Sequence, residues 1–414
     1  MPRLRREIAA AVGGLPATFW WLWAGMLVNA LAQFVFPFLA LYLVRRGLGA
    51  AQAGLLVSLM GVGGVVSGTL GGALADRIGR RPTMAASLLA SAAATAALAF
   101  LRGPAAIAAG VLVLGLVSQM FRTAAQATIA DVVPPADRVR AYGLSYWAVN
   151  LGFAVSLVVG GALAQASFTA LFLADAATTL LFAVLVLWKV PETRPAAAAA
   201  AARGALLLAG IGAPLRDRVF APFLLLNLAF AVILLQFNVA APIDMARHGI
   251  APATYGVLMA LNGAVIALTQ AVAARLTGRR DPSRVLALAA VLTGVGYGLF
   301  AVVRAPLLYS VAIVIWTLGE ICHTPVATAV VASLSPVEER GRYQGAYGMS
   351  WGLATFLAPA VGSVVLDRAG APWLWGGCLA LGLTAAAGQL AAAPARRARL
   401  ASASASPEPR ADPA

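Results

Sequence analysis

The sequence predicts an all-α membrane protein in which twelve transmembrane helices form two pseudo-symmetric halves of six helices each. Three observations lead to this fold class: long apolar runs, an asymmetric placement of basic residues and an internal repeat. The chain has 414 residues, of which 61% are hydrophobic and only 11% are charged. A soluble domain carries about 25% charged residues. We therefore expect lipid, and not water, to surround most of the chain.

Apolar runs recur along the whole chain, and each is long enough to cross a bilayer core of about 30 Å. In chain order the predicted spans are Phe19–Leu43, Ala53–Leu74, Met84–Leu101, Ala105–Ile129, Gly143–Leu163, Ala170–Trp188, Pro222–Pro242, Tyr255–Ala274, Val285–Val303, Leu307–Ala332, Gly345–Leu366 and Trp373–Ala392. The 41 glycines and 23 prolines are compatible with these spans, because membrane helices tolerate both residues better than soluble helices do.

The net charge of +15 is placed in a way that indicates topology and excludes nucleic acid as the expected partner. Of the 30 lysines and arginines, 23 fall on the N-terminus, the even-numbered connections and the C-terminal tail, six fall on the odd-numbered connections, and Arg122 falls within a span. We call the side with the 23 residues the basic side and the other the opposite side. By the positive-inside rule the basic side is cytoplasmic. We therefore expect a multi-pass protein of the bacterial cytoplasmic membrane with both termini in the cytoplasm.

An internal repeat predicts the domain organisation. Pro134, Arg138 and Arg140 recur as Pro336, Arg340 and Arg342 at an offset of 202, and residues 142–145 recur at 347–350 at an offset of 205. An offset near half the length indicates two homologous halves, which we place at residues 1–190 and 219–394. Residues 191–218 between them are expected to be a cytoplasmic linker, and residues 395–414 a disordered cytoplasmic tail. The linker contains seven consecutive alanines, 196–202, for which a helix and an irregular segment remain equally open.

The connection after the second span carries the most specific motif. Residues 72–84 read Gly-Ala-Leu-Ala-Asp-Arg-Ile-Gly-Arg-Arg-Pro-Thr-Met. This resembles the signature G-x-L-A-D-R-x-G-R-R/K that the major facilitator superfamily carries between its second and third helices. The matching positions are Gly72, Leu74, Ala75, Asp76, Arg77, Gly79, Arg80 and Arg81. The resemblance implies a secondary transporter that works by rocking of two halves around a central site.

The resemblance also implies a role for this motif as a cytoplasmic latch between the halves. The latch residues would be Gly72, Asp76, Arg77, Gly79, Arg80 and Arg81. The Asp76 carboxylate can accept hydrogen bonds from a facing helix N-terminus or from an arginine. The glycine ladder 64, 68 and 72 predicts close approach of a neighbouring helix. The alternative interpretation is a solvated basic turn that only sets topology. In the second half, Gly278-Arg279-Arg280 repeats Gly79-Arg80-Arg81. This repeat lacks the acid, because Arg275 occupies the region where the aspartate is expected.

Three ionisable residues lie deep within spans, where a charge costs about 3 kcal/mol on insertion scales. Arg122 lies ~13 Å from the end of the fourth span, and it shares a helix face with Gln119 and Gln126. Antiporters of the superfamily carry an arginine in the fourth helix that is associated with proton coupling, and the resemblance implies the same for Arg122. The alternatives are a structural ion pair or a snorkelling arginine. Asp175 in the sixth span is expected to form a structural interhelical hydrogen bond.

Glu320 in the tenth span is the best candidate proton carrier. A carboxyl in an apolar cavity is protonated more easily, and when it is ionised it attracts a cation, so proton and cation can compete for it. The alternative is a neutral glutamic acid bonded to a backbone carbonyl. Asp244, with His248 nearby, is either an outer-gate acid that joins the proton coupling or a wet loop residue. His323, beside Glu320 in the sequence, is expected to be a satisfied packing histidine.

Polar and aromatic residues at helical spacing predict the lining of a broad amphipathic substrate cavity. The candidates are Asn29, Gln33, Gln119, Gln126, Tyr146, Asn150, Asn227, Asn238, Trp351 and Thr355. Ordinary helix packing is the alternative for each of them. One departure weakens the resemblance to drug/proton antiporters: Ser156-Leu157 stand in the fifth span where those proteins carry Gly-Pro.

Together these features predict a secondary active transporter for proton-coupled efflux of amphipathic or cationic drugs. A carrier for a sugar or an organic anion is the alternative, in which Arg122 would bind the anionic group. A non-transporting membrane receptor with the same fold is the alternative from another class. The sequence has no P-loop, no metal-ligand spacing and no nucleophile–base pair, so we expect neither an enzyme nor a cofactor or metal. The expected partners are a small-molecule substrate, protons and the lipid bilayer, and we expect a monomer.

Overall fold

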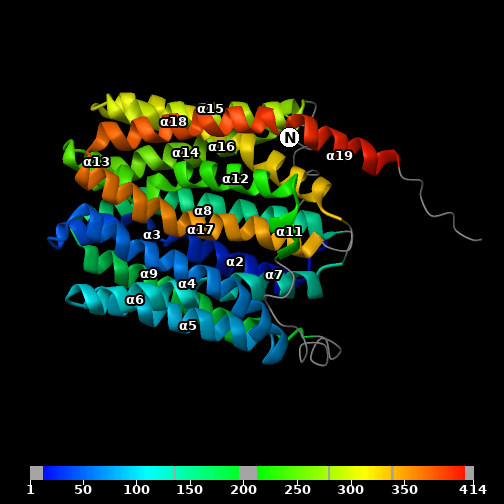
Figure 1. Ribbon diagram of the computed structural model, residues 1–414. Helices are drawn as coiled ribbons and strands as arrows, with labels where there is room; N and C mark the ends of the chain where they lie inside the picture. The colour runs from blue at the N-terminus through cyan, green and yellow to red at the C-terminus, as the bar shows by residue number, and fades with distance from the viewer. Residues whose placement is uncertain (1–12, 135–136, 195–211, 278–279, 337–339, 406–414) are drawn as a thin grey trace, which may run out of the picture. The chain divides into compact units, whose positions relative to one another are not determined.

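The computed structural model describes residues 13–134, 137–194, 212–277, 280–336 and 340–405. Within these residues every regular element is a helix (Figure 1), which confirms the all-α prediction. The alanine run 196–202, Gly278 and Arg279 lie outside them. The chain divides into two compact units, which are described separately below.

Unit 1 comprises Met1–Leu207, Gln236–Ala264 and Thr355–Ala369. Its helices are α2 (Ala17–Leu31), α3 (Val35–Arg45), α4 (Ala50–Arg77), α5 (Arg80–Leu98), α6 (Pro104–Ser118), α7 (Met120–Val132), α8 (Arg138–Ala166), α9 (Phe168–Lys189) and α13 (Ala240–Arg247), with the first part of α14 (Pro252–Thr277) and the last part of α17 (Arg340–Arg368). Helix α4 packs against α6, α5 against α9 and α2 against α8 (Figure 1).

Unit 2 comprises Leu208–Leu235, Val265–Ala354 and Gly370–Ala414. Its helices are α11 (Gly212–Arg216), α12 (Phe220–Leu234), α15 (Pro282–Gly298), the 3-10 turn η3 (Leu299–Ala301), α16 (Pro306–Leu334), α18 (Ala371–Ala391) and α19 (Ala393–Ala405), with the rest of α14 and α17. The 3-10 turn η2 (Leu235–Asn238) follows α12 at the boundary of the units. Helix α15 packs against both α16 and α18, and the rings of Tyr297, Trp316 and Trp375 stack there.

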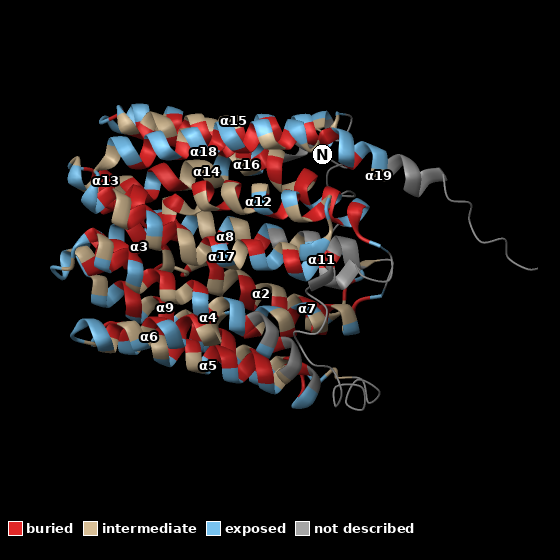
Figure 2. Ribbon diagram, viewed as in Figure 1, coloured by how far each residue is buried: buried red, intermediate tan, exposed pale blue. Residues whose placement is uncertain are grey.

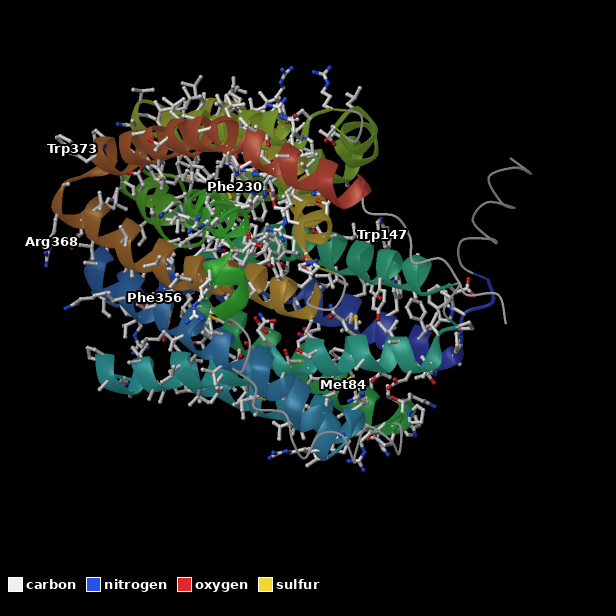
Figure 3. The ribbon with its side chains drawn as sticks, turned by 45° about the vertical axis from the view of Figure 1, so that its right-hand side comes forward. Met84, Trp147, Phe230, Phe356, Arg368 and Trp373 are labelled. Atoms are coloured by element: carbon white, nitrogen blue, oxygen red, sulfur yellow. The ribbon has the colours of Figure 1, made fainter. Side chains whose placement is uncertain are left out.

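Eleven helical segments of the described chain are long and apolar enough to cross a membrane. The predicted span Met84–Leu101 corresponds to α5, which is a helix but is not among the eleven. Its composition explains this, because two arginines begin it and the buried Ser87, Ser91 and Thr95 lie along it. Large apolar side chains are exposed elsewhere, among them Trp373 with 74% of its surface free. Exposed residues occur along many of the helices (Figure 2), and Figure 3 labels Trp373. A multi-pass membrane fold accounts for such exposure, and the count of twelve remains a prediction for α5.

Glycines of α4 let helices approach at their backbones, and Gly64, the one ladder glycine whose surroundings are described, is not among them. A Cβ atom built on Gly63 would lie 2.4 Å from the backbone nitrogen of Leu116, and one on Gly71 would lie 2.8 Å from Cα of Met120. A Cβ atom on Gly61 would lie 2.6 Å from the nitrogen of Phe356 in α17. A Cβ atom on Gly64, in contrast, would meet nothing within 4 Å. Among these described glycines the close approaches therefore occur at Gly61, Gly63 and Gly71 and not at Gly64.

The predicted disordered tail begins where the structure has a helix. Helix α19 covers Ala393–Ala405, so the expectation of disorder from residue 395 is wrong up to residue 405. The reason is tertiary, because Arg396 is buried and donates hydrogen bonds to Ser283 of α15 and Gln389 of α18. The composition of the tail could not reveal these partners. Residues 406–414 lie outside the described part.

The contrast between Gly63 and Gly64 gives a test of the α4–α6 packing. Gly63→Ala should lower the thermal stability of the detergent-solubilised protein, since overpacking of this kind costs about 1–3 kcal/mol. Gly64→Ala should leave stability unchanged, because its new methyl group enters open space. The measurement is the melting temperature of purified protein. Equal melting temperatures for the two variants would contradict the described packing.

Candidate functional site

A serine of α5 interrupts the fourth span. Helices α6 and α7 meet at Gln119. The Ser87 hydroxyl donates to the Val117 carbonyl at 2.6 Å and accepts from the Phe121 N–H at 3.0 Å. In an unbroken helix the Phe121 N–H would bond to the Val117 carbonyl directly, so the hydroxyl is inserted into the ladder. Arg122 is the next residue, and the interruption therefore sets the position from which its side chain extends.

Arg122 lies on an exposed polar stripe within this apolar span. Gln119, Arg122 and Gln126 are all exposed, as the helical spacing predicts. Tyr142 of α8 donates its hydroxyl to the Gln126 carbonyl at 3.1 Å. The structure gives the Arg122 guanidinium no hydrogen bond or ion pair within the residues that it describes. Because a bare charge facing lipid is costly, this stripe is expected to face water.

Glu320 is half-buried on α16 and begins a second polar stripe. Thr324 and Thr328 follow it at intervals of four residues, with increasing exposure along the stripe. The Thr324 hydroxyl donates to the Glu320 carbonyl at 3.1 Å. Helix α16 lies close to α15 at the preceding residue, since a Cβ atom on Gly319 would lie 2.7 Å from the Ala289 carbonyl oxygen. Glu320 is displaced from this contact by about 100° around the helix.

His323 is part of a buried aromatic cluster in unit 2. Its ring lies flat on Phe230 of α12, with centroids 3.6 Å apart and an interplanar angle of 5°, and edge-on to Trp351 at 6.5 Å. Neither ring nitrogen has a hydrogen-bond partner in the described part of the chain, so the histidine packs as expected but is not satisfied. Asn227 is fully buried and donates to the Ser350 hydroxyl at 2.7 Å. Asn227 therefore lies in packing, whereas the sequence suggested a cavity face.

The seventh span is interrupted as well, and this changes where its polar residues lie. Helix α12 ends at Leu234, and α13 begins at Ala240. Tyr297 donates its hydroxyl to the Leu234 carbonyl at 2.6 Å, and Tyr255 donates to the Phe237 carbonyl at 2.7 Å. Helical spacing does not carry across the interruption, so Asn227 and Asn238 need not share a face. Asn238 is buried, with 2% of its surface free.

The remaining candidates from the sequence occupy varied positions. Asn29 is half-buried and donates to the Thr179 hydroxyl at 2.9 Å, and Gln33 lies in an interruption of the first span. Asp244 is 1% exposed, with its carboxylate 3.6 Å from the His248 ring, so it is not a wet loop residue. Asn150, Trp351 and Thr355 are half-buried, and the side chain of Tyr146 is outside the description.

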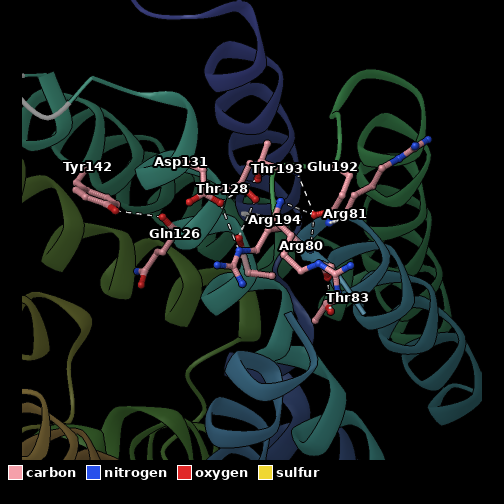
Figure 4. A network of polar contacts seen from close by, with 12 residues as sticks. Arg80, Arg81, Thr83, Gln126, Thr128, Asp131, Tyr142, Glu192, Thr193 and Arg194 are labelled. Carbon is pink, nitrogen blue, oxygen red and sulfur yellow. Dashed lines mark hydrogen bonds and ion pairs between the residues drawn. The ribbon is translucent and has the colours of Figure 1, made fainter. Parts of the chain in front are cut away.

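Polar contacts tie the predicted latch together on the basic side of unit 1 (Figure 4). The Glu192 carboxylate accepts the backbone N–H groups of Arg80 at 2.9 Å and Arg81 at 3.2 Å. These belong to the first turn of α5, where the helix dipole favours a negative charge. Burial raises the pKa of Glu192, but its backbone hydrogen bonds outweigh this and lower the pKa. The acid at this helix N-terminus is thus Glu192, a residue that the sequence analysis left in the linker.

Asp131 of α7 completes this network. The Arg80 guanidinium lies 3.4 Å from its carboxylate, and the Thr193 hydroxyl donates to it at 3.1 Å. Arg194 donates to the Arg77 carbonyl at the end of α4. The polar run of residues 191–194, directly after a span, was the signal that could have identified these residues. The surroundings of Gly72 and of the Asp76 side chain lie outside the described part.

A second polar cluster lies on the basic side of unit 2. The Asp217 carboxylate accepts hydrogen bonds from Arg399 of α19 at 2.5 Å and from Tyr343 of α17 at 2.7 Å. It also accepts the backbone N–H groups of Val219 and Phe220, which begin α12. Partial burial raises the pKa of Asp217, but these hydrogen bonds outweigh it and lower the pKa to about 2. Helix α19 therefore joins the ends of α12, α16 and α17, because Arg399 also donates to the Leu334 carbonyl.

Comparison with known proteins defines the class to which this fold and these polar stripes belong. The family model described as Major Facilitator Superfamily matches residues 22–243 and 235–412. The chain therefore belongs to the Major Facilitator Superfamily, a family of membrane transporters, as the latch motif indicated. Within the described residues no three His, Cys, Asp or Glu side chains gather as a metal site would require.

Relatives and solved structures agree with this assignment. The chain is 25% identical to a Na(+), Li(+), K(+)/H(+) antiporter of Planococcus maritimus, with 80% of this chain and 85% of the antiporter covered. It is 25% identical to the multidrug resistance protein MdtH of Klebsiella pneumoniae (strain 342), with 83% and 87% covered. A peptide transporter POT in complex with sulfate has a TM-score of 0.74 at 21% identity, over 95% of this chain and 99% of that one. The nucleoside transporter NupG has a TM-score of 0.73 at 16% identity, over 93% and 99%.

Ser87 and Ser91 give a matched test of the interruption beside Arg122. Ser87→Ala should reduce transport about tenfold, because the loss of one positioning hydrogen bond of ~1 kcal/mol also shifts the origin of Arg122. Ser91→Ala should have no effect, since the Ser91 hydroxyl has no partner in the described chain. The measurement is the initial rate of substrate flux in proteoliposomes with equal protein content. Equal rates for the two variants would argue against a positioning role of Ser87.

Arg399 and Arg397 give a matched test of the α19 cluster. Arg399→Gln should lower stability near neutral pH by ~1 kcal/mol, whereas Arg397 is 65% exposed and Arg397→Gln should change little. The folded-state pKa of Asp217 is depressed, so its contribution is present above the unfolded pKa of about 3.9 and is lost as the pH falls toward 2. The parent should therefore lose more stability between pH 5 and pH 2 than Arg399→Gln does. Melting curves across this range measure both effects, and identical pH dependence would exclude the cluster as their source.

Proposed function

We propose that this protein is a proton-coupled exporter of amphipathic or cationic compounds. The observation that carries the proposal is Glu320, a half-buried carboxyl group on a polar stripe of an otherwise apolar helix. Burial makes such a group easy to protonate, and its ionised form attracts a cation. Proton and substrate then compete for one carboxylate, and a proton gradient drives the substrate out. Alternating access by the two halves of the repeat would move the site between the sides.

Further features support the proposal. Two relatives carry names that fit it, an antiporter of monovalent cations and a multidrug resistance protein. Arg122 and the buried Asp244 are proposed as additional proton-coupling groups. The basic side is proposed to face the cytoplasm of a bacterial cell, with Arg77, Arg80 and Arg81 in a latch that opens and closes during transport. We propose that a single chain performs the cycle.

A second candidate function rests on the unpaired guanidinium of Arg122. A charged side chain without an ion pair in the described residues is available to bind an anionic substrate. The protein would then be a carrier for an organic anion. Arg122→Ala would abolish anion flux in this case, and Glu320 would be dispensable. A receptor without transport activity would show no proton-linked flux for any substrate.

Glu320→Gln tests the leading proposal. The amide keeps the size of the side chain but cannot bind or release a proton, so efflux driven by a pH gradient should fall by at least tenfold. Substrate exchange without a gradient should survive, because exchange needs no net proton movement. The measurement is efflux of a cationic dye from proteoliposomes, with and without an imposed pH gradient.

The matched control is Thr324→Val, which alters the same stripe one turn away but leaves the carboxyl group in place. It should retain gradient-driven efflux of the dye. Unchanged gradient-driven efflux in Glu320→Gln would reject the assigned role of this glutamate. A general loss of both efflux and exchange would indicate a folding defect, which is recognised by a lowered melting temperature.

A further inference from the structure

The first span, formed by α2 and α3, is interrupted, and a carboxylate from another helix closes the interruption. Helix α2 ends at Leu31, and α3 begins at Val35. The backbone N–H groups of Phe34 and Val35 both donate to the same oxygen of Asp175 in α9, each at 2.9 Å. Asp175 is buried, with 8% of its surface free. It lies about 10 Å along α9 from its first residue, well inside the span.

The two N–H groups would have other partners in a continuous helix. They would bond to the carbonyls of Ala30 and Leu31, four residues earlier. In the structure the Ala30 carbonyl instead accepts the N–H of Gln33 at 3.3 Å. Inside a membrane an unsatisfied N–H costs several kcal/mol. The Phe34 N–H also reaches the Ala32 carbonyl at 2.8 Å, so the Asp175 carboxylate stabilises the interrupted form chiefly through the Val35 N–H and strengthens the bonding of Phe34.

The carboxylate depends on the interruption in turn. Within the described residues no lysine or arginine forms an ion pair with Asp175. Its negative charge is balanced by the two N–H groups at the start of α3 and by the hydroxyl of Thr179, one turn further along α9. If the first span became continuous, both N–H groups would return to the helix ladder. An ionised carboxylate without these donors, buried in an apolar setting, is strongly disfavoured.

We propose that Asp175 is a proton-binding residue of the transport cycle, ionised when the first span is interrupted and protonated when the span is continuous. Straightening of the first span takes up one proton from water at the carboxylate oxygen, and interruption of the span returns it. In transporters built from such repeats the binding sites are typically formed by discontinuous helices, so we link the bending of the interrupted first span to the state of the site. This proposal rests on the proposed proton coupling and adds a second carboxyl group to it.

Asp175 is placed so that few other charges act on it. The helices packed against α9 are α5, α2, α8 and α3, and α2 has no ionisable residue. On the others and on α9 itself the titratable or charged residues are Lys189, Arg80, Arg81, Arg138, Arg140, Tyr142, Tyr146, Tyr42 and Arg45. The cationic ones occupy the first or last turns of their helices. Tyr42 packs on Phe172 with ring centroids 4.8 Å apart, and its hydroxyl donates to the Leu98 carbonyl.

The interruption of the seventh span is closed differently. Its carbonyl groups at Leu234 and Phe237 accept hydrogen bonds from tyrosine hydroxyls. A tyrosine hydroxyl ordinarily keeps its proton near neutral pH. Bending of the seventh span therefore involves no comparable uptake of a proton. Of these two interruptions, the proton-linked bending is thus assigned to that of the first span.

The test measures the bend itself and not only transport. Spin labels are attached at Ala17→Cys and Arg45→Cys, the two exposed ends of the first span, in full-length protein that carries Cys322→Ala and Cys378→Ala. A continuous helix would place the two backbones about 42 Å apart. Distance distributions are recorded by pulsed electron resonance in lipid nanodiscs between pH 5 and pH 9. We expect the longer distance to gain population as the pH falls.

Asp175→Asn keeps an oxygen that can accept both N–H groups but carries no charge in either form. Its distance distribution should be independent of pH, and gradient-driven transport should fall at least tenfold. Asp131→Asn, a carboxyl control in the latch, should retain the pH-dependent distances. A pH-independent distribution in the parent, or an unchanged pH response in Asp175→Asn, overturns the proposal.

Glu320→Gln separates this proposal from the proposed function. It should keep the pH-dependent distances even where gradient-driven efflux is lost. If efflux persists in Glu320→Gln while Asp175→Asn abolishes the distance change, the role of Glu320 fails and that of Asp175 stands. If Glu320→Gln also abolishes the distance change, the first span responds to Glu320 and the assignment to Asp175 is wrong.

Discussion

The constraint on which the structure depends is that a membrane offers no water to bond a free backbone group. Within the described residues three spans are nevertheless interrupted at the points named above, and in each case a side chain from a neighbouring helix supplies a partner. Asp175 accepts two N–H groups of the first span, the Ser87 hydroxyl bridges the fourth, and tyrosine hydroxyls donate to the seventh. Such an interruption depends on tertiary structure, because the interrupted helix needs a hydrogen-bond partner from a neighbouring helix.

The same constraint explains the basic side of each unit. A helix that begins there exposes N–H groups without partners, and each unit satisfies one such set with a carboxylate from outside the helix. Glu192 caps α5 in unit 1, and Asp217 caps α12 in unit 2. The arginine that completes each network comes from a different place, since Arg80 belongs to the capped helix and Arg399 to α19. Unit 2 therefore has an organised network on its basic side, even though the second half of the sequence lacks the acid of the latch motif.

The fold was predictable from the sequence because apolar length, charge placement and one motif are local or additive properties. The all-α membrane class and the family follow from them. The polar stripe of Arg122 was also predictable, because four-residue spacing within one helix survives folding. The capping acid Glu192 and the helix α19 were missed, since each is defined by partners more than a hundred residues away. Asn227 and Asn238 were both predicted to line the cavity from helical spacing, because periodicity cannot register an interruption such as η2.

Arg122, Glu320 and Asp175 lie within the spans in three different environments. These environments differ in how the protonation of each residue depends on conformation. Arg122 lies exposed on a polar stripe, and since a charge facing lipid is costly, we expect its charge to face a cavity that a substrate can reach. Glu320 is half-buried at the start of its stripe, where solvation changes readily with conformation. Asp175 is buried and depends on two backbone donors, so its charge is tied to the shape of one helix. A group solvated by water can titrate without any movement, whereas protonation of a group held by backbone donors weakens the hydrogen bonds that fix the backbone. Of the three, Asp175 is therefore the one whose protonation we link to a conformational change.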